Sequence, residues 1–217
     1  MSRRRRRPVD RSAYAGWIPL ACIMAAICLV AISAIVWVTS PNWGLHNAIA
    51  PSRDVGVIPT VPSKPSPLIT PDRIEIPKIG TDAAVFAIPT AADGALDPPI
   101  DPRQVGWWDG GVRPGSPKGT AIITSHINYA GVAGALARIG LLNPGDAVYI
   151  YGINAAKTVK AKYTITGVRS YYKTALPYKE IFDQKSVGRV ALVTCGGPFD
   201  QATGNYLENI VVFAVPA

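Results

Sequence analysis

Short apolar runs separated by turn-forming residues recur from Asp72 to the end of the chain, and this pattern restricts the fold more than any other feature. Each run is rich in β-branched residues and is followed by Gly, Pro, Asn or Asp, which is typical of strands. The 217-residue chain also holds 20 glycines and 20 prolines, a composition that disfavours a helical bundle. The sequence therefore predicts a mainly β domain with about eight strands over residues 72–217.

Two of the predicted strands, residues 189–194 and 209–215, contain continuous apolar runs (190–193 and 210–215), which indicates that both of their faces are covered. Residues 157–172 instead alternate apolar residues with lysines, as in a strand with one buried face. One or two short helices are expected, with residues 134–142 and 175–182 as the candidates. A closed or nearly closed barrel would leave such a chain without free strand edges, so we expect an eight-stranded β-barrel.

A 22-residue segment without charge, Trp17–Val38, follows an arginine-rich N-terminus. A helix that rises about 1.5 Å per residue would cross a hydrocarbon core of about 30 Å over this length. Residues 1–16 carry six arginines and one aspartate, and the positive-inside rule keeps such a tail in the cytoplasm. A cleaved signal peptide is the alternative, but its apolar core is usually about 7–15 residues long. We therefore predict an N-terminal transmembrane helix with the following domain outside the cell.

Residues 39–71 contain seven prolines and no long apolar period, which predicts a Pro-rich linker. The chain has a formal charge of +8, but residues 72–217 hold fourteen basic and twelve acidic residues. No nucleic-acid partner is expected, because such binding needs a basic face on the folded domain. The predicted order is thus a cytoplasmic tail (1–16), a transmembrane anchor (17–38), a linker (39–71) and an extracellular domain (72–217).

Cys195 is the only cysteine outside the predicted membrane segment, which contains Cys22 and Cys28. Exported proteins usually pair their cysteines, so this thiol is either buried for structural reasons or reactive. His126 is the only histidine of the predicted domain, because His46 falls in the linker. A thiol nucleophile needs a base or cation beside it, so these two are the candidate catalytic residues. One cysteine and one histidine do not make a zinc site, and no metal or cofactor is expected.

Six segments within residues 73–215 share the pattern of one family. They are "ITSHIN", "LVTCGGPFD", "GNYLENIVVFAV", "RIEIPKIGTDAAV", "VGWWDGGVRPGSPKGTAIITSH" and "LLNPGDAVYIYG". Together they resemble sortases, and most closely the class F group of actinobacteria. The resemblance implies a sortase-like barrel with Cys195 as nucleophile and His126 as catalytic histidine, although Ser125 stands where the family usually has a glycine.

The resemblance also implies the reaction of a cysteine transpeptidase. In that reaction the cysteine attacks the Thr–Gly bond of an LPxTG-like sorting signal and forms a thioester, which an amine of the cell wall or of a pilin then resolves. The implied partners are surface proteins with a C-terminal sorting signal and a cell-surface amine. The implied location is the cell membrane, with a single membrane pass and the catalytic domain outside.

The sequence departs from the sortase pattern at Leu207. Sortases usually carry an arginine about a dozen residues after the cysteine, and in the class F pattern Tyr-Arg-Asp-Asn this position corresponds to the leucine of "NYLEN". Leucine cannot donate to an oxyanion, and loss of one such donor typically costs about 10²–10³ in rate. Another cation could replace it (Arg113, Arg169 or Arg189), or backbone donors around Gly196 could suffice. Alternatively, the protein is a degenerate sortase that binds but hardly turns over.

Two other classes of protein compete with this assignment. An L,D-transpeptidase usually carries its histidine within a few residues of the cysteine, whereas sixty-nine positions separate the two residues here. A non-catalytic surface binding domain is the other, and the missing arginine is its main support.

Overall fold

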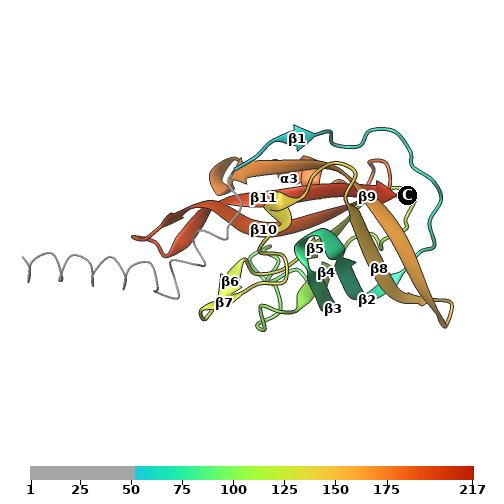
Figure 1. Ribbon diagram of the computed structural model, residues 1–217, viewed down its shortest axis with the longest axis horizontal. Coiled ribbons are helices and arrows are strands. Elements are labelled where there is room, and N and C mark those ends of the chain that lie inside the picture. Colours follow the sequence, from blue (N-terminus) through green and yellow to red (C-terminus); the bar gives the residue numbers. More distant parts are fainter. Residues whose placement is uncertain (1–51) are drawn as a thin grey trace, which may run out of the picture. The chain divides into compact units, whose positions relative to one another are not determined.

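The structure, a computed structural model, describes residues 52–217, which form a mixed β-barrel of eight strands with one short α-helix (Figure 1). The barrel strands are β2 (Thr70–Ile76), β3 (Thr81–Ile88), β4 (Val105–Trp108), β5 (Thr120–Thr124), β8 (Ala147–Asn154), β9 (Lys157–Tyr172), β10 (Arg189–Asp200) and β11 (Asn205–Pro216). Three short strands lie outside the barrel wall: β1 (Val55–Gly56), β6 (Asn128–Tyr129) and β7 (Val132–Ala133). The prediction of a mainly β, eight-stranded barrel is confirmed.

The barrel closes through β9, which pairs with β8 along its first half and with β11 along its second half. The order around the wall is β9-β11-β10-β5-β4-β3-β2-β8. The β3–β4 and β5–β10 pairs are parallel and the other neighbours are antiparallel. Closure pairs both sides of every wall strand, which removes the exposed edges at which chains associate.

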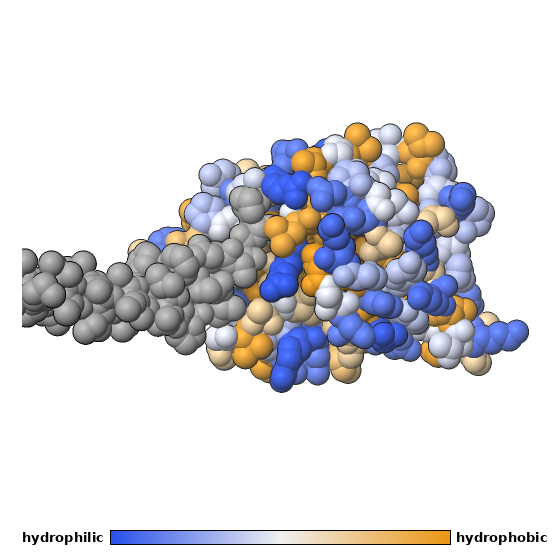
Figure 2. All heavy atoms as spheres, viewed as in Figure 1, coloured by the Kyte–Doolittle hydropathy of each residue, from blue (hydrophilic) through white to orange (hydrophobic). Residues whose placement is uncertain are grey.

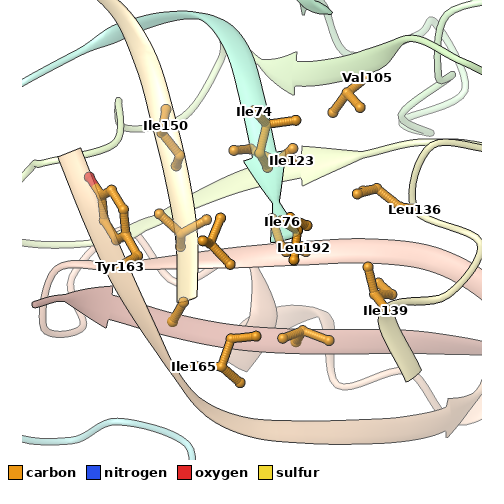
Figure 3. Close-up of a cluster of buried hydrophobic side chains, with 14 of the residues drawn as sticks. Ile74, Ile76, Val105, Ile123, Leu136, Ile139, Ile150, Tyr163, Ile165 and Leu192 are labelled. Carbon is orange, nitrogen blue, oxygen red and sulfur yellow. The ribbon is translucent and has the colours of Figure 1, made fainter. Parts of the chain in front are cut away.

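One apolar cluster fills the interior, and every wall strand contributes to it (Figure 3). Alternate side chains along a strand point inward, so β9 buries Ala161, Tyr163 and Ile165 while Lys160 and Lys162 are exposed. The alternation seen in the sequence over residues 157–172 is therefore the alternation of the two faces of the wall. Other fully buried side chains labelled in Figure 3 include Ile74, Ile76, Ile123, Ile150 and Leu192.

A second apolar cluster lies on the outer face of the wall, over β5, β10 and β11. Its buried members are Ile122, Ile181, Ala191, Val211 and Phe213. Ile181 belongs to the helix α3 (Tyr178–Ile181), so the connection between β9 and β10 covers this part of the wall. This cover explains why β10 and β11 are apolar at consecutive positions, as the sequence predicted.

Of the described residues, only Tyr178–Ile181 form an α-helix, which lies within the predicted segment 175–182. The other candidate, residues 134–142, contains a single 3₁₀ turn at Ile139–Leu141. Gly134 and Gly140 lower the helix propensity of that segment, and its apolar side chains are used to pack on the barrel instead.

Residues 52–69 lie along the outside of the barrel (Figure 1). β1 pairs with β9, and the Arg169 guanidinium donates to the carbonyl oxygens of Val55 at 2.7 Å and Gly56 at 2.8 Å. Ile69, just before β2, is fully buried. The described part of the predicted linker is therefore bonded to the domain at several points.

The surface of the described domain mixes apolar and hydrophilic side chains (Figure 2). Val57, Val61, Phe86 and Ile100 are examples of exposed apolar residues. Apolar residues scattered singly are ordinary on a protein surface, so they do not by themselves mark an interface.

The predicted cytoplasmic tail (1–16) and transmembrane segment (17–38) lie outside the described residues. Among residues 52–217, no helix has the length and apolarity needed to cross a bilayer. The membrane anchor stays a prediction from the sequence.

Candidate active site

Cys195 lies on β10, just before the regular pairing with β11 breaks. Its partner across the ladder is Asn209, and the register shifts between Gly196 and Phe199. Gly197 has a φ of +69°, and a side chain there would meet the Glu208 carboxyl carbon at 2.6 Å. Glycine is needed at this position for both backbone and space, so the glycines after the cysteine shape the end of the strand.

The parallel pairing of β5 and β10 brings His126 and Cys195 to the same end of the barrel wall. The ladder runs as far as the pair Thr124 and Val193. His126 and Cys195 each lie two residues beyond this last pair. The Thr124 hydroxyl also donates to the Val193 carbonyl at 3.0 Å, which holds the two strand ends together.

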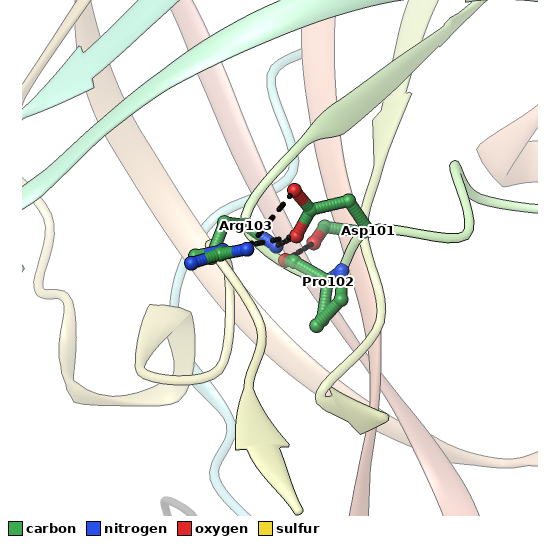
Figure 4. A network of polar contacts seen from close by, with 4 residues as sticks. Asp101, Pro102 and Arg103 are labelled. Atoms are coloured by element: carbon green, nitrogen blue, oxygen red, sulfur yellow. Dashed lines mark hydrogen bonds and ion pairs between the residues drawn. The ribbon is translucent and has the colours of Figure 1, made fainter. Parts of the chain in front are cut away.

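The two residues that precede the candidate pair are bonded to each other. Thr194 Oγ1 donates to the carbonyl oxygen of Ser125 at 2.9 Å, and both residues are buried. Ser125 Oγ in turn donates to the Pro102 carbonyl at 3.2 Å. Pro102 sits in a turn that Arg103 Nε closes by donating to Asp101 Oδ1 at 3.1 Å (Figure 4). The backbone just before the histidine is thus anchored from two sides.

Cys195 and His126 both line one groove on the outer face of the barrel, with a volume of about 660 Å³. Its floor consists of outward-facing residues of β5, β10 and β11, and its sides come from the β3–β4 and β9–β10 connections. Most of the other lining side chains are apolar, among them Leu96, Pro98, Ile122, Leu176, Ile181 and Val193. The two residues singled out from the sequence are therefore brought to one cavity of peptide size.

The His126 ring is half-buried and stacks on Tyr129 of β6, with ring centroids 5.1 Å apart and an interplanar angle of 24°. Burial lowers the pKa of His126 below its usual 6.5, and the negative charge of Asp97 acts in the opposite direction. The ring nitrogens make no hydrogen bond to another described residue. The imidazole is therefore available to exchange a proton with a molecule bound in the groove.

The Cys195 side chain is partly buried and packs against Ile127, Ala137 and Tyr206. The Tyr206 hydroxyl accepts a hydrogen bond from Asn128 Nδ2 at 2.9 Å. Burial is the main cause that raises the pKa of Tyr206, so its hydroxyl stays protonated at neutral pH. The thiol is thus fixed by apolar contacts on one side while it also lines the groove.

Leu207 occupies the position at which the pattern Tyr-Arg-Asp-Asn has an arginine and this chain does not. It lies on β11 two residues before Asn209, so it faces the same side of the wall as Asn209 and Cys195. Its side chain is 41% exposed and does not line the groove. Leucine carries no charge, so β11 offers no cation at this position.

The three arginines considered as replacements all have other partners. Arg113 donates to Thr70 Oγ1 at 3.2 Å, and Arg169 holds the backbone of β1. Arg189 begins β10, about 20 Å from the cysteine along the strand, and donates to Thr120 Oγ1 at 2.8 Å. In the part of the chain that the structure describes, no lysine or arginine lines the groove. The structure gives none of the three a place at the site.

Asn209 is a groove residue that the sequence analysis did not single out. It lines the cavity together with Cys195 and His126. A weak signal was present, because Asn209 is the one polar residue at the start of the apolar run 209–215. Nothing in the sequence alone says that this residue pairs with the cysteine.

Comparisons with known proteins agree with this architecture. Residues 74–217 match the sortase domain family. Sortase C1 of Streptococcus agalactiae, solved in complex with MTSET, is similar in structure at 18% identity and a TM-score of 0.50, with 67% of this chain and 66% of that chain covered. Sortase C-1 of Actinomyces oris has 20% identity and a TM-score of 0.50, with 67% and 72% covered.

A third solved structure, sortase A of Corynebacterium diphtheriae, has 16% identity and a TM-score of 0.49 and covers 71% of this chain and 62% of that chain. The chain spans just under two thirds of the S. agalactiae structure, and at these identities the likeness is one of fold. No curated protein matches the sequence. Because the family match extends over most of the chain, this protein belongs to the sortase family.

Proposed function

We propose that the protein is a membrane-anchored, sortase-type cysteine transpeptidase that cleaves an LPxTG-like sorting signal and transfers it to a cell-surface amine. One observation carries the proposal: Cys195 and His126, sixty-nine positions apart, line a single groove on a sortase barrel. A thiol and an imidazole with access to the same bound carbonyl are the two groups that acyl transfer through a thioester requires.

In the acylation step, the Cys195 thiolate attacks the carbonyl carbon of the Thr–Gly bond. A carbon–sulfur bond forms, and the carbonyl electron pair moves to oxygen to give a tetrahedral oxyanion. On collapse, the carbon–nitrogen bond breaks and the leaving amine takes a proton from the His126 imidazolium. Burial lowers the pKa of His126, so this imidazolium is a stronger acid than an exposed one and gives up its proton readily.

In the second step, an acceptor amine attacks the thioester carbonyl. A new carbon–nitrogen bond forms, the carbon–sulfur bond breaks, and the electron pair returns to sulfur. His126 takes the proton that the amine loses. The enzyme is thereby restored with the thiolate and imidazolium that began the cycle.

The apolar lining of the groove suits the leucine and proline of such a signal, which would bury apolar surface there. We assign the protein to class F because Val193–Gly197 and "NYLEN" follow that group's pattern apart from the leucine. The proposed partners are surface proteins with a C-terminal sorting signal and a cell-wall or pilin amine. The proposed location is the cell membrane, with residues 17–38 as anchor and the catalytic domain outside.

A non-catalytic, sortase-like surface binding domain is the second candidate. The leucine at position 207 favours it, together with the lack of any lysine or arginine in the groove among the described residues. Such a domain would bind the same apolar signal without cleaving it.

Transpeptidation of a fluorogenic LPxTG-type peptide onto a glycine or lysine amine separates the two candidates. We expect turnover by the full-length protein, none by Cys195→Ala, and a loss of about 10²–10⁴ with His126→Ala. Cys28→Ala, in the predicted anchor, is the control and should keep wild-type activity. Wild-type turnover by Cys195→Ala would overturn the proposed mechanism, and binding without turnover by the unmodified protein would favour the second candidate.

A further inference from the structure

We infer that the side-chain amide of Asn209 donates to the oxyanion formed during acylation and so replaces the family's missing arginine. The inference rests on the proposed function, because it names the donor for that reaction. Without it, the reaction would lack a side-chain donor on β11, the strand that normally supplies the arginine.

The placement of Asn209 comes from the strand ladder. Asn209 pairs with Cys195 on one side and with Tyr171 on the other. Directly paired residues of antiparallel strands project from the same face, with Cβ atoms about 4.5–5.5 Å apart. Cys195 and Asn209 therefore lie side by side on one face of the wall, and His126, two residues beyond the last β5–β10 pair, lines the same groove.

Within residues 52–217, nothing occupies the side chain of Asn209, which is available to a substrate. It lines the groove, and its amide makes no hydrogen bond to any other described residue. Other asparagines nearby are engaged, since Asn128 Nδ2 donates to Tyr206 and Asn205 Nδ2 donates to the Thr203 carbonyl. An unengaged amide beside the nucleophile is a donor that the fold itself does not use.

The amide has the reach and the chemistry for the role. The carbonyl carbon bonds to the Cys195 sulfur, and the oxyanion oxygen is attached to that carbon. The oxyanion therefore forms next to Cys195, whose partner across the ladder is Asn209. Asn Nδ2 carries two donors, and one of them can point to that oxygen. Asparagine is a recurrent oxyanion donor, and removal of one such donor typically lowers the rate by about 10²–10³.

The rival donor is the Tyr206 hydroxyl. Besides burial, the nearby Cys195 contributes to raising the pKa of Tyr206. Tyr206 is buried and does not line the groove, whereas Asn209 does. Access to the substrate therefore favours Asn209.

The test measures the rate at which an LPxTG-type peptide acylates Cys195 in the full-length protein. We expect Asn209→Ala to slow acylation about 10²–10³-fold, while the control Asn205→Ala, on the same strand, stays within a factor of a few of wild type. Asn209→Asp keeps the shape of the side chain but removes its hydrogen-bond donors, so it should slow acylation at least as much as Asn209→Ala. Adding Leu207→Arg to Asn209→Ala should recover at least tenfold, because a guanidinium then supplies the lost donor.

Alkylation of Cys195 by iodoacetamide is the second readout, since this displacement at a methylene forms no oxyanion. Equal alkylation rates in wild type and Asn209→Ala, with unequal acylation, support the inference. Equal acylation rates in wild type and Asn209→Ala overturn the inference and leave the proposed function standing. A parallel fall of acylation and alkylation in Asn209→Ala also overturns the inference and leaves the proposed function standing. If the wild-type thiol alkylates but no peptide acylates it, both the inference and the proposed function are overturned.

Discussion

At the scale of single residues, two opposing influences set the acidity of His126. Burial of the ring disfavours its charged form, and the carboxylate of Asp97 favours it, with burial the larger of the two. The stacked Tyr129 ring contributes to that burial. The balance keeps the pKa of His126 below 6.5, so the imidazolium is lost at a lower pH than for an exposed histidine.

Asp97→Asn should therefore lower the pKa of His126 further, because only the opposing burial remains. An NMR titration of the imidazole resonances in a His46→Gln background measures this directly. Asp93→Asn, in the same loop, is the control and should leave the midpoint where it is. A midpoint that stays constant or rises in Asp97→Asn would contradict the assignment.

At the scale of elements, the site depends on the contacts that hold the ends of β5 and β10 together. Their parallel pairing brings together residues sixty-nine positions apart, and the bond from Thr194 to the Ser125 carbonyl fastens the strand ends. Both partners are buried, so the carbonyl has no access to water if the hydroxyl is removed.

Thr194→Val removes that hydroxyl at nearly constant shape. We expect the free energy of unfolding to fall by about 1–3 kcal/mol, the cost of an unsatisfied buried acceptor. Thr158→Val, at an exposed position of β9, should change it by less than about 0.5 kcal/mol. Denaturant unfolding of both variants makes the comparison, and equal stabilities would show that the bond contributes nothing.

The strands themselves could be predicted because alternation and apolar runs depend on neighbours along the chain. The lysine alternation of residues 157–172 and the covered strand 189–194 both matched the structure. The partner of each strand could not be predicted, since pairing joins segments far apart. For this reason the chemistry of Cys195 and His126 was visible in the sequence, but the place of Asn209 opposite the cysteine was not.

At the scale of the whole molecule, the barrel and the segment before it form one packed unit within residues 52–217. The prolines of residues 39–71 suggested a linker, and composition alone could not reveal that Ile69 is buried. The backbone of residues 53–59 also accepts hydrogen bonds from Arg169 and Arg189, two of the arginines that the sequence offered as candidates for the site. The guanidinium groups of Arg169 and Arg189 therefore bind the backbone of this segment and not the candidate site.

Ile69→Ala should accordingly lower the free energy of unfolding by about 2–5 kcal/mol, as for other buried large-to-small changes. Val61→Ala lies in the same segment but is 73% exposed in its native form, and we expect a change within about 0.5 kcal/mol. Thermal or denaturant unfolding distinguishes them. Equal effects would mean that the segment does not pack on the barrel in solution.

The most direct test of the central claim is the intact mass of the full-length protein after brief incubation with an LPxTG-type peptide. We predict an adduct equal to the peptide up to and including its threonine, attached to Cys195 as a thioester that hydroxylamine releases. The adduct should be absent from Cys195→Ala and strongly reduced in His126→Ala. No adduct on the wild-type protein, or an unchanged adduct on Cys195→Ala, would contradict the account.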